Sequence, residues 1–190
     1  MRLLKYAATA VAACVALVGL GAPAEAIGIG VPPTGYFTIE SRAKSPKFPT
    51  QKQYVTAGNG GLFAGLSVLN GSQPTPDRQQ FLALPLEDGT YIICSRSSSE
   101  GWALSCLDSL GSRTPGTALA LRPFDYLNRG QRWYFNDLGS SSGSVHNIWN
   151  ADSNMVLSRA VSFDGIPTSG LVQYVSDPGW KVQEWVIKAV

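Results

Sequence analysis

Histidine is nearly absent from this chain of 190 residues, because His146 is the only one. Val145 and Asn147 flank it in a segment that reads as a strand, so we expect a half-buried strand residue and no catalytic base. No serine or cysteine lies in a recognisable nucleophile pattern, and no pair of carboxylates stands at the spacing of a general acid and base. The sequence also lacks a cluster of metal-ligating residues. It therefore predicts a protein that is not an enzyme and needs neither a metal nor another cofactor.

An excess of charge of one sign is missing too. The chain carries 15 basic and 13 acidic residues, which gives a formal net charge of +2. A nucleic-acid-binding protein normally gathers its basic residues on one face, whereas here they are scattered along the sequence. We expect no nucleic-acid partner.

Long apolar runs are absent except at the start of the chain. Residues 6–20 are rich in Ala, Val and Leu, follow Arg2 and Lys5, and precede the small-x-small sequence Ala-Glu-Ala at 24–26. This is the pattern of a secretory signal peptide, and the run is shorter than the ~20 residues of a membrane span. A lipid-attachment box ending at Cys14 is the less favoured alternative, because the apolar run continues beyond it. We expect residues 1–26 to be removed, leaving a secreted, extracellular protein of residues 27–190 with no stable membrane span; the order of residues 27–34 is left open.

Cysteine is scarce, with three in the chain and only Cys94 and Cys106 beyond the leader. They fall on two expected strands on either side of a turn rich in serine at 97–101. Cysteines that face each other across a hairpin can form a disulfide in an oxidising compartment. Two buried free thiols are the alternative.

The most prominent feature of the sequence is an internal repeat. A triplet of Gln, any residue and an aromatic residue starts at residues 79, 131 and 183, at intervals of 52. Segments that open with glycine and read as strand starts begin at residues 35, 89 and 143, at intervals of 54. Two markers with nearly the same period indicate three copies of one supersecondary unit. Such units bury their apolar faces only by packing around a shared core.

The secondary-structure signal is nearly all strand. Short runs rich in apolar residues alternate with turns rich in Ser, Gly, Pro and Asn, and beyond the leader no segment keeps a period of 3.6 residues. Four strands in each of three units make twelve, at residues 36–41, 54–57, 66–69, 81–84, 91–95, 103–107, 117–121, 131–135, 145–149, 155–158, 171–175 and 184–187.

Twelve strands in three units, each ending in Gln-x-aromatic, resemble the ricin B-type β-trefoil, a lectin-like family. The resemblance covers residues 27–190 as one domain, with repeats at about 35–86, 87–138 and 139–190. It implies that the triplets belong to the core, where the ring fills the barrel and the amide ties down a loop. On this basis the residues that specify the fold are Gln79, Phe81, Gln131, Trp133, Gln183 and Trp185.

The same resemblance implies a sugar pocket made of an Asp in a Cys-Leu-Asp stretch, a strand that supplies a stacking ring, and an Asn before the triplet. The middle repeat matches best but in part, and we expect its site to comprise Asp108, Arg122 at the stacking position, Phe124 as a substitute ring, Asn128 in place of the missing Asn, and Gln131. Thr56 and Ala160 occupy the position of Asp108 in the other repeats. The third repeat keeps Gln173 of the strand but places Val175 where the ring belongs. As an alternative, Asp108 is a solvated turn acid that caps the backbone of Gly111 or Ser112.

Two functions follow from these patterns. The first is a secreted, non-enzymatic module that binds a glycan or glycoprotein, for which Asp108→Ala is expected to abolish binding and leave folding intact. The alternative is a protein-binding trefoil, such as a toxin-assembly subunit or a protease inhibitor, that has lost sugar binding. Exposed aromatic residues outside the triplets would favour the alternative, and the candidates are Trp102, Trp149 and Trp180.

Overall fold

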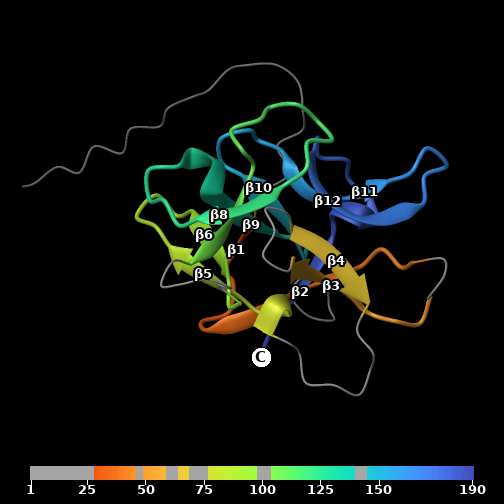
Figure 1. The fold of residues 1–190 in the computed structure, drawn as a ribbon, viewed down its shortest axis with the longest axis horizontal. Coiled ribbons are helices and arrows are strands. Elements are labelled where there is room, and N and C mark those ends of the chain that lie inside the picture. Colours follow the sequence, from red (N-terminus) through yellow and green to blue (C-terminus); the bar gives the residue numbers. More distant parts are fainter. Residues whose placement is uncertain (1–27, 46–48, 59–63, 69–76, 98–103, 140–144) are drawn as a thin grey trace, which may run out of the picture.

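The computed structural model describes residues 28–45, 49–58, 64–68, 77–97, 104–139 and 145–190. They form thirteen β-strands in one sheet and three short 3₁₀ helices, and no α-helix occurs among them (Figure 1). In chain order the elements are β1 Gly28–Gly30, β2 Tyr36–Ser41, β3 Gln53–Ala57, β4 Ala64–Val68, η1 Asp77–Gln79, β5 Phe81–Pro85, β6 Tyr91–Ser95, β7 Ser105–Asp108, β8 Ala120–Pro123, η2 Arg129–Gln131, β9 Arg132–Asp137, β10 Val145–Asn150, β11 Val156–Val161, β12 Pro167–Tyr174, η3 Lys181–Gln183 and β13 Trp185–Ala189.

The strand count differs from the expected twelve by one strand at the start. Each of the twelve expected segments overlaps one of β2 to β13, and β2 and β6 have the expected bounds. The additional strand is β1, which pairs antiparallel with β9. Residues 28–30 are therefore an ordered strap along the sheet.

Six of the strands close into a ring. β2 pairs with β5, β5 with β6, β6 with β9, β9 with β10, β10 with β13, and β13 returns to β2. Three of the remaining pairs are the hairpins β3–β4, β7–β8 and β11–β12. A closed ring leaves no unpaired barrel edge to recruit another chain. A six-stranded barrel capped by three hairpins is the architecture expected of a β-trefoil.

The core of the barrel is built around the aromatic residues of the triplets. Phe81, Trp133 and Trp185 are fully buried among aliphatic and aromatic side chains from all three parts of the sequence. The indole N–H of Trp133 donates to the carbonyl of Leu107 at 2.9 Å, and that of Trp185 donates to the carbonyl of Leu157 at 3.0 Å. Each indole thus fills the core while its one polar group stays hydrogen-bonded.

The glutamine of each triplet ends a 3₁₀ helix, so the strand that was expected to begin at Gln131 begins one residue later. η1, η2 and η3 start at residues 77, 129 and 181, again at intervals of 52. The side-chain oxygen of Gln131 accepts from the backbone N–H of Asp125 at 3.0 Å, and that of Gln183 accepts from Asp177 at 2.9 Å. The amide nitrogen of Gln131 donates to the carbonyl of Pro123, and that of Gln183 donates to the carbonyl of Val175. The amides of Gln131 and Gln183 therefore fix the loops that lead into η2 and η3.

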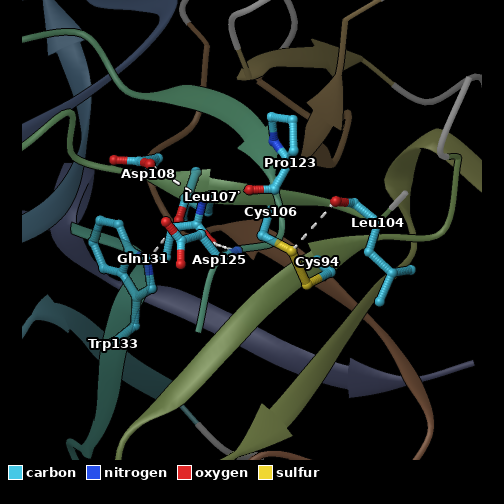
Figure 2. Close-up of a disulfide and its surroundings, with 9 residues drawn as sticks. All are labelled: Cys94, Leu104, Cys106, Leu107, Asp108, Pro123, Asp125, Gln131 and Trp133. Carbon is cyan, nitrogen blue, oxygen red and sulfur yellow. Dashed lines mark hydrogen bonds between the residues drawn. A yellow bond between two sulfur atoms is a disulfide. The ribbon is translucent and has the colours of Figure 1, made fainter. Parts of the chain in front are cut away.

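A disulfide joins Cys94 on β6 to Cys106 on β7 (Figure 2). The two residues are direct partners in the ladder, and both are buried beside Ile92. The disulfide anchors the strand that carries Asp108, two residues beyond Cys106.

His146 was expected to be half-buried, and this is wrong: only 2% of it is exposed. The reason is β1, because a Cβ on Gly30 would lie 2.5 Å from Nδ1 of His146, so the strap passes directly over the imidazole. Phe135 meets the ring edge to face at 5.8 Å. Neither ring nitrogen has a hydrogen-bond partner. Burial lowers the pKa of His146, and this effect outweighs the opposite influence of Asp137.

Candidate functional site

Five of the six sugar-site candidates lie around one open hollow of about 750 Å³, called here the Asp108 hollow. Asp108 ends β7, Arg122 lies on β8, Phe124 follows β8, and Asn128 and Gln131 stand at the two ends of η2. The remaining lining residues are Leu110, Gly111, Pro123 and Asp125. Segments 108–111 and 122–131 meet there because β7 and β8 form a hairpin and η2 packs against β7.

Asp108 forms the floor of the hollow and is only 2% exposed. Its Oδ1 accepts from the backbone N–H of Leu110 at 2.6 Å, and its Oδ2 accepts from the amide nitrogens of Asn128 at 2.7 Å and Gln131 at 3.2 Å. The expected alternative of a solvated acid that caps Gly111 or Ser112 is therefore wrong in both respects. A carboxylate offers about four acceptor positions. Three are used by contacts among the described residues, which leaves one unoccupied.

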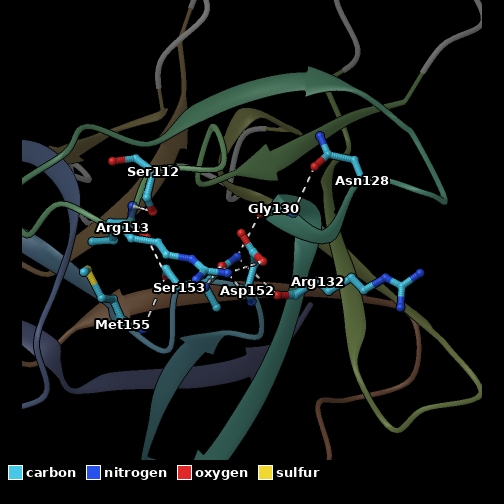
Figure 3. Close-up of polar contacts among 10 residues, drawn as sticks. Ser112, Arg113, Asn128, Gly130, Arg132, Asp152, Ser153 and Met155 are labelled. Atoms are coloured by element: carbon cyan, nitrogen blue, oxygen red, sulfur yellow. Dashed lines mark hydrogen bonds and ion pairs between the residues drawn. The ribbon is translucent and has the colours of Figure 1, made fainter.

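Asn128 replaces the asparagine that the family pattern places directly before Gln131. Its Oδ1 caps η2 by accepting from the backbone N–H of Gly130 at 2.9 Å (Figure 3). Its Nδ2 donates to Asp108. The amide has a second N–H, which is not used by these contacts. The family position itself holds Gly130, where a Cβ would lie 2.8 Å from Oδ1 of Asp108. A side chain at position 130 would therefore require Asp108 to shift.

Gln131 has a supporting role in this hollow. It is fully buried, and both of its N–H groups and its carbonyl are occupied by Asp108, Pro123 and Asp125 (Figure 2). Its amide holds the carboxylate of Asp108 and the loop at 123–125 in a fixed relation. It has no donor left for a ligand.

Two exposed side chains stand at the rim. Phe124 is 42% exposed. The guanidinium of Arg122 is exposed as well, and no residue in the described part of the chain forms an ion pair or a side-chain hydrogen bond with it. The Asp108 hollow thus combines an acceptor, an amide donor, a free cation and an apolar ring.

The other two repeats lack the acid at this position. Oγ1 of Thr56 accepts from Nε2 of Gln79 at 3.1 Å, the same contact that Asp108 makes with Gln131. Ala160 has no polar side chain to offer Gln183. Only the middle of the three equivalent positions carries a carboxylate.

Gln173, the sixth candidate, is not part of the hollow. It is fully buried on β12, its Nε2 donates to the carbonyl of Ser112 at 2.6 Å, and its Oε1 accepts from the hydroxyl of Ser153 at 2.7 Å. Ser112 and Ser153 belong to two loops that approach each other, where Arg113 also pairs with Asp152 at 3.3 Å (Figure 3). Gln173 therefore joins these loops and does not contact a ligand in the Asp108 hollow.

Sequence reasoning missed a second, smaller hollow of about 230 Å³ in the third repeat. Its wall is formed by Tyr174 and Trp180, whose ring centroids are 5.9 Å apart. The aromatic residue that was expected at position 175 is thus found one residue earlier, at Tyr174. The sequence held a signal for it, because Tyr174 lies 52 residues after Arg122, which was assigned to the stacking position of the middle repeat. Trp180 is 40% exposed, whereas Trp149 stacks on Tyr134 and is half-buried; Trp102 lies outside the described residues.

Among the residues that the structure describes, no group of three or more His, Cys, Asp or Glu side chains is arranged to hold a metal ion. None of their helices has the length and apolar character needed to cross a membrane.

No protein-family model matches the sequence, and no curated protein matches it. Solved structures do match. The ricin B-like lectin of Macrolepiota procera in complex with lactose is 16% identical, with 85% of this chain and 99% of the lectin covered and a TM-score of 0.58. The designed threefold-symmetric protein ThreeFoil is 20% identical, with 82% and 99% covered and a TM-score of 0.56. The Haemophilus ducreyi cytolethal distending toxin is 13% identical, with 80% and 82% covered and a TM-score of 0.56. The chain is therefore a β-trefoil with the fold of the ricin B-like lectins.

Proposed function

We propose that this protein binds carbohydrate through the Asp108 hollow. The proposal is supported by the hydrogen-bonding groups of the hollow that make no contact among the described residues. One acceptor position of Asp108 and one N–H of Asn128 stand beside the exposed Phe124. Adjacent sugar hydroxyls need one acceptor and one donor, and an aromatic ring covers the apolar face of a pyranose.

Charge-assisted hydrogen bonds supply the specificity. A sugar hydroxyl that donates to the carboxylate of Asp108 forms one of the stronger hydrogen bonds available to a neutral ligand. Arg122, which also lines the hollow, can donate to further hydroxyl or ring oxygens. The chemistry is that of binding without bond cleavage, so the protein acts as a lectin-like module and not as an enzyme.

The test is a glycan array probed with the purified protein and three variants. Phe124→Ala and Arg122→Ala remove exposed rim groups, so we expect both to fold normally and to lose the array signal. Phe163→Ala, which removes a fully exposed ring at the β11–β12 turn, is the matched control and should keep the signal. A selective signal that survives Phe124→Ala and Arg122→Ala would exclude the Asp108 hollow as the sugar site.

Asp108→Ala is no longer the cleanest test. The buried carboxylate holds Leu110, Asn128 and Gln131, so its removal alters the loop as well as the ligand contact. Loss of binding in this variant would not separate the two effects.

Export of the protein through a signal peptide at residues 1–26 is part of the same proposal. A disulfide between Cys94 and Cys106 fits an oxidising compartment. Sequencing the N-terminus of protein recovered from the medium is expected to give Ile27 as the first residue. Recovery of the uncleaved chain in the cytoplasm would contradict this.

A protein-binding function is the second candidate, and a specific surface favours it. The turn between β11 and β12 exposes three apolar side chains, Val161, Phe163 and Ile166. Exposed apolar groups that gather at one place are typical of protein-interaction sites. A blank glycan array from folded protein would favour this candidate, and loss of a captured partner on Phe163→Ala would then locate the interface.

A further inference from the structure

A third hollow, of about 410 Å³, lies away from the proposed sugar site and is called here the basic hollow. It is formed where the end of β2 and the residues after it meet the segment before β3 and the start of η3. Its lining residues are Glu40, Ser41, Arg42, Ala43, Lys44, Pro49, Thr50, Gln51, Lys52, Lys181 and Val186. The fold therefore brings together basic residues that are scattered in the sequence.

Four cations face a single carboxylate in this lining, and that carboxylate is already occupied. Oε2 of Glu40 accepts from Nζ of Lys188 at 2.8 Å and lies 3.6 Å from Nζ of Lys52. Arg42 is paired with Glu184 at 2.7 Å. Lys44 and Lys181 are exposed, and neither forms an ion pair with any residue that the structure describes. The hollow thus has a surplus of positive charge with two ammonium groups free to bind.

A buried cation adds to this surplus from below. Arg159 is 2% exposed, and among the residues that the structure describes its guanidinium donates to neutral groups alone: the carbonyls of Ala43, Thr168 and Pro167 and the side-chain oxygen of Gln53. Ala43 itself lines the basic hollow. A buried charge is normally compensated by an opposite charge. Here the hydrogen bonds are satisfied but the charge is not, so it contributes to the positive potential of the hollow.

We propose that the basic hollow binds an oxyanion, a sulfate or phosphate group, either free or carried as a sulfate ester on a polysaccharide. A tetrahedral oxyanion presents acceptor oxygens in several directions, which suits lysine residues that line one hollow from different segments. The sugar site and the basic hollow are separate, so this binding does not depend on the Asp108 hollow.

The experiment is calorimetric titration of the purified protein at low and at physiological ionic strength. The probes are sodium sulfate, sodium phosphate and dextran sulfate, with uncharged dextran as the control ligand. Saturable binding that weakens with salt is expected for at least one charged probe. Preference for dextran sulfate over both ions would identify a sulfated glycan as the ligand, and equal binding of the ions would identify the free anion. Absence of saturable binding by all three overturns the proposal.

Two variants locate the binding. Lys44→Ser/Lys181→Ser removes the two unpaired ammonium groups, and we expect its affinity to fall about tenfold or more, since each contact at 4 Å contributes about 1 kcal/mol in water. Arg129→Ser is the matched control, because Arg129 is exposed and starts η2 as Lys181 starts η3. An equal loss in both variants, or none in the double variant, would show that the ligand does not sit in the basic hollow. Phe124→Ala is expected to leave this affinity unchanged.

Discussion

The side-chain amide of Gln131 donates a hydrogen bond to the carboxylate of Asp108 at 3.2 Å, although the two residues lie 23 apart in the sequence. Gln131 directly precedes β9, the strand that carries the core residue Trp133, and Asp108 forms the floor of the Asp108 hollow. A residue of the fold and a residue of the proposed site are therefore parts of one hydrogen-bond network. Substitution of Asp108 should affect stability as well as binding.

Asp108→Ala is expected to lower the free energy of unfolding by at least about 1–3 kcal/mol, the cost of leaving the fully buried amide of Gln131 without this partner. Asp108→Thr is the informative companion. Thr56 accepts from Gln79 in the first repeat, so a threonine at 108 can keep the contact with Gln131 and should cost less. Urea unfolding of the two variants measures the difference. Equal losses for Ala and Thr would argue that the amide contact contributes little.

Trp133→Ala is expected to cost roughly 3–5 kcal/mol, the range for removal of a large ring from a core. Trp133→Phe should cost less, because Phe81 fills the equivalent position of the first repeat, but it leaves the carbonyl of Leu107 without its indole partner. Trp180→Ala, which removes a ring that is 40% exposed, serves as the control. Similar losses for Trp133→Ala and Trp180→Ala in chemical denaturation would mean that Trp133 does not support the core.

The strands could be predicted from the sequence because their signals are local. Tyr36–Ser41 and Tyr91–Ser95 follow a glycine and are rich in apolar residues, and both appear with the expected bounds. β1 carries no such signal, since Gly28–Gly30 is short and is a strand only because β9, more than a hundred residues later, provides its partner. The burial of His146 could not be foreseen for the same reason, because β1 is what covers it.

The residues of the candidate site could be predicted where they belong to a recognisable sequence pattern. Gln131 was found through the 52-residue interval and Asp108 through the Cys-Leu-Asp stretch of the family resemblance, and both residues line one hollow. The contacts of Gln173, a candidate from the third repeat, could not be predicted from the sequence. A long amide on a strand can point to either of two neighbouring loops, and only the packing decides that it joins Ser112 and Ser153.

Reduction of the disulfide is expected to destabilise the protein. Cys94 and Cys106 are 12 residues apart, and closing a loop of about 15 residues contributes about 3 kcal/mol in the chain-entropy description. Cys94→Ala/Cys106→Ala should therefore lose about 2–4 kcal/mol. The wild type measured with a reducing agent is the control and should lose a similar amount. A variant as stable as the oxidised wild type would show that β6 and β7 need no covalent link.

Stability is expected to fall on mild acidification because of His146. Burial holds its folded-state pKa below the ordinary value of 6.5, so the unfolded chain binds the proton more readily than the folded one. For a lowered histidine pKa the stabilising contribution is complete above pH 6.5 and is lost as the pH falls below that value, by up to about 1.4 kcal/mol per pH unit.

The chain has no second histidine, so this loss can be assigned to one residue. His146→Phe keeps a planar ring between Gly30 and Phe135 and removes the group that titrates. Urea unfolding at a series of pH values from about 7 to 5, above the range in which most carboxylates titrate, should show a decline in the wild type and a nearly flat profile in the variant. Parallel declines in both proteins would mean that the imidazole is not forced to give up its proton on folding. The strap formed by β1 would then have to open enough to let water reach the ring.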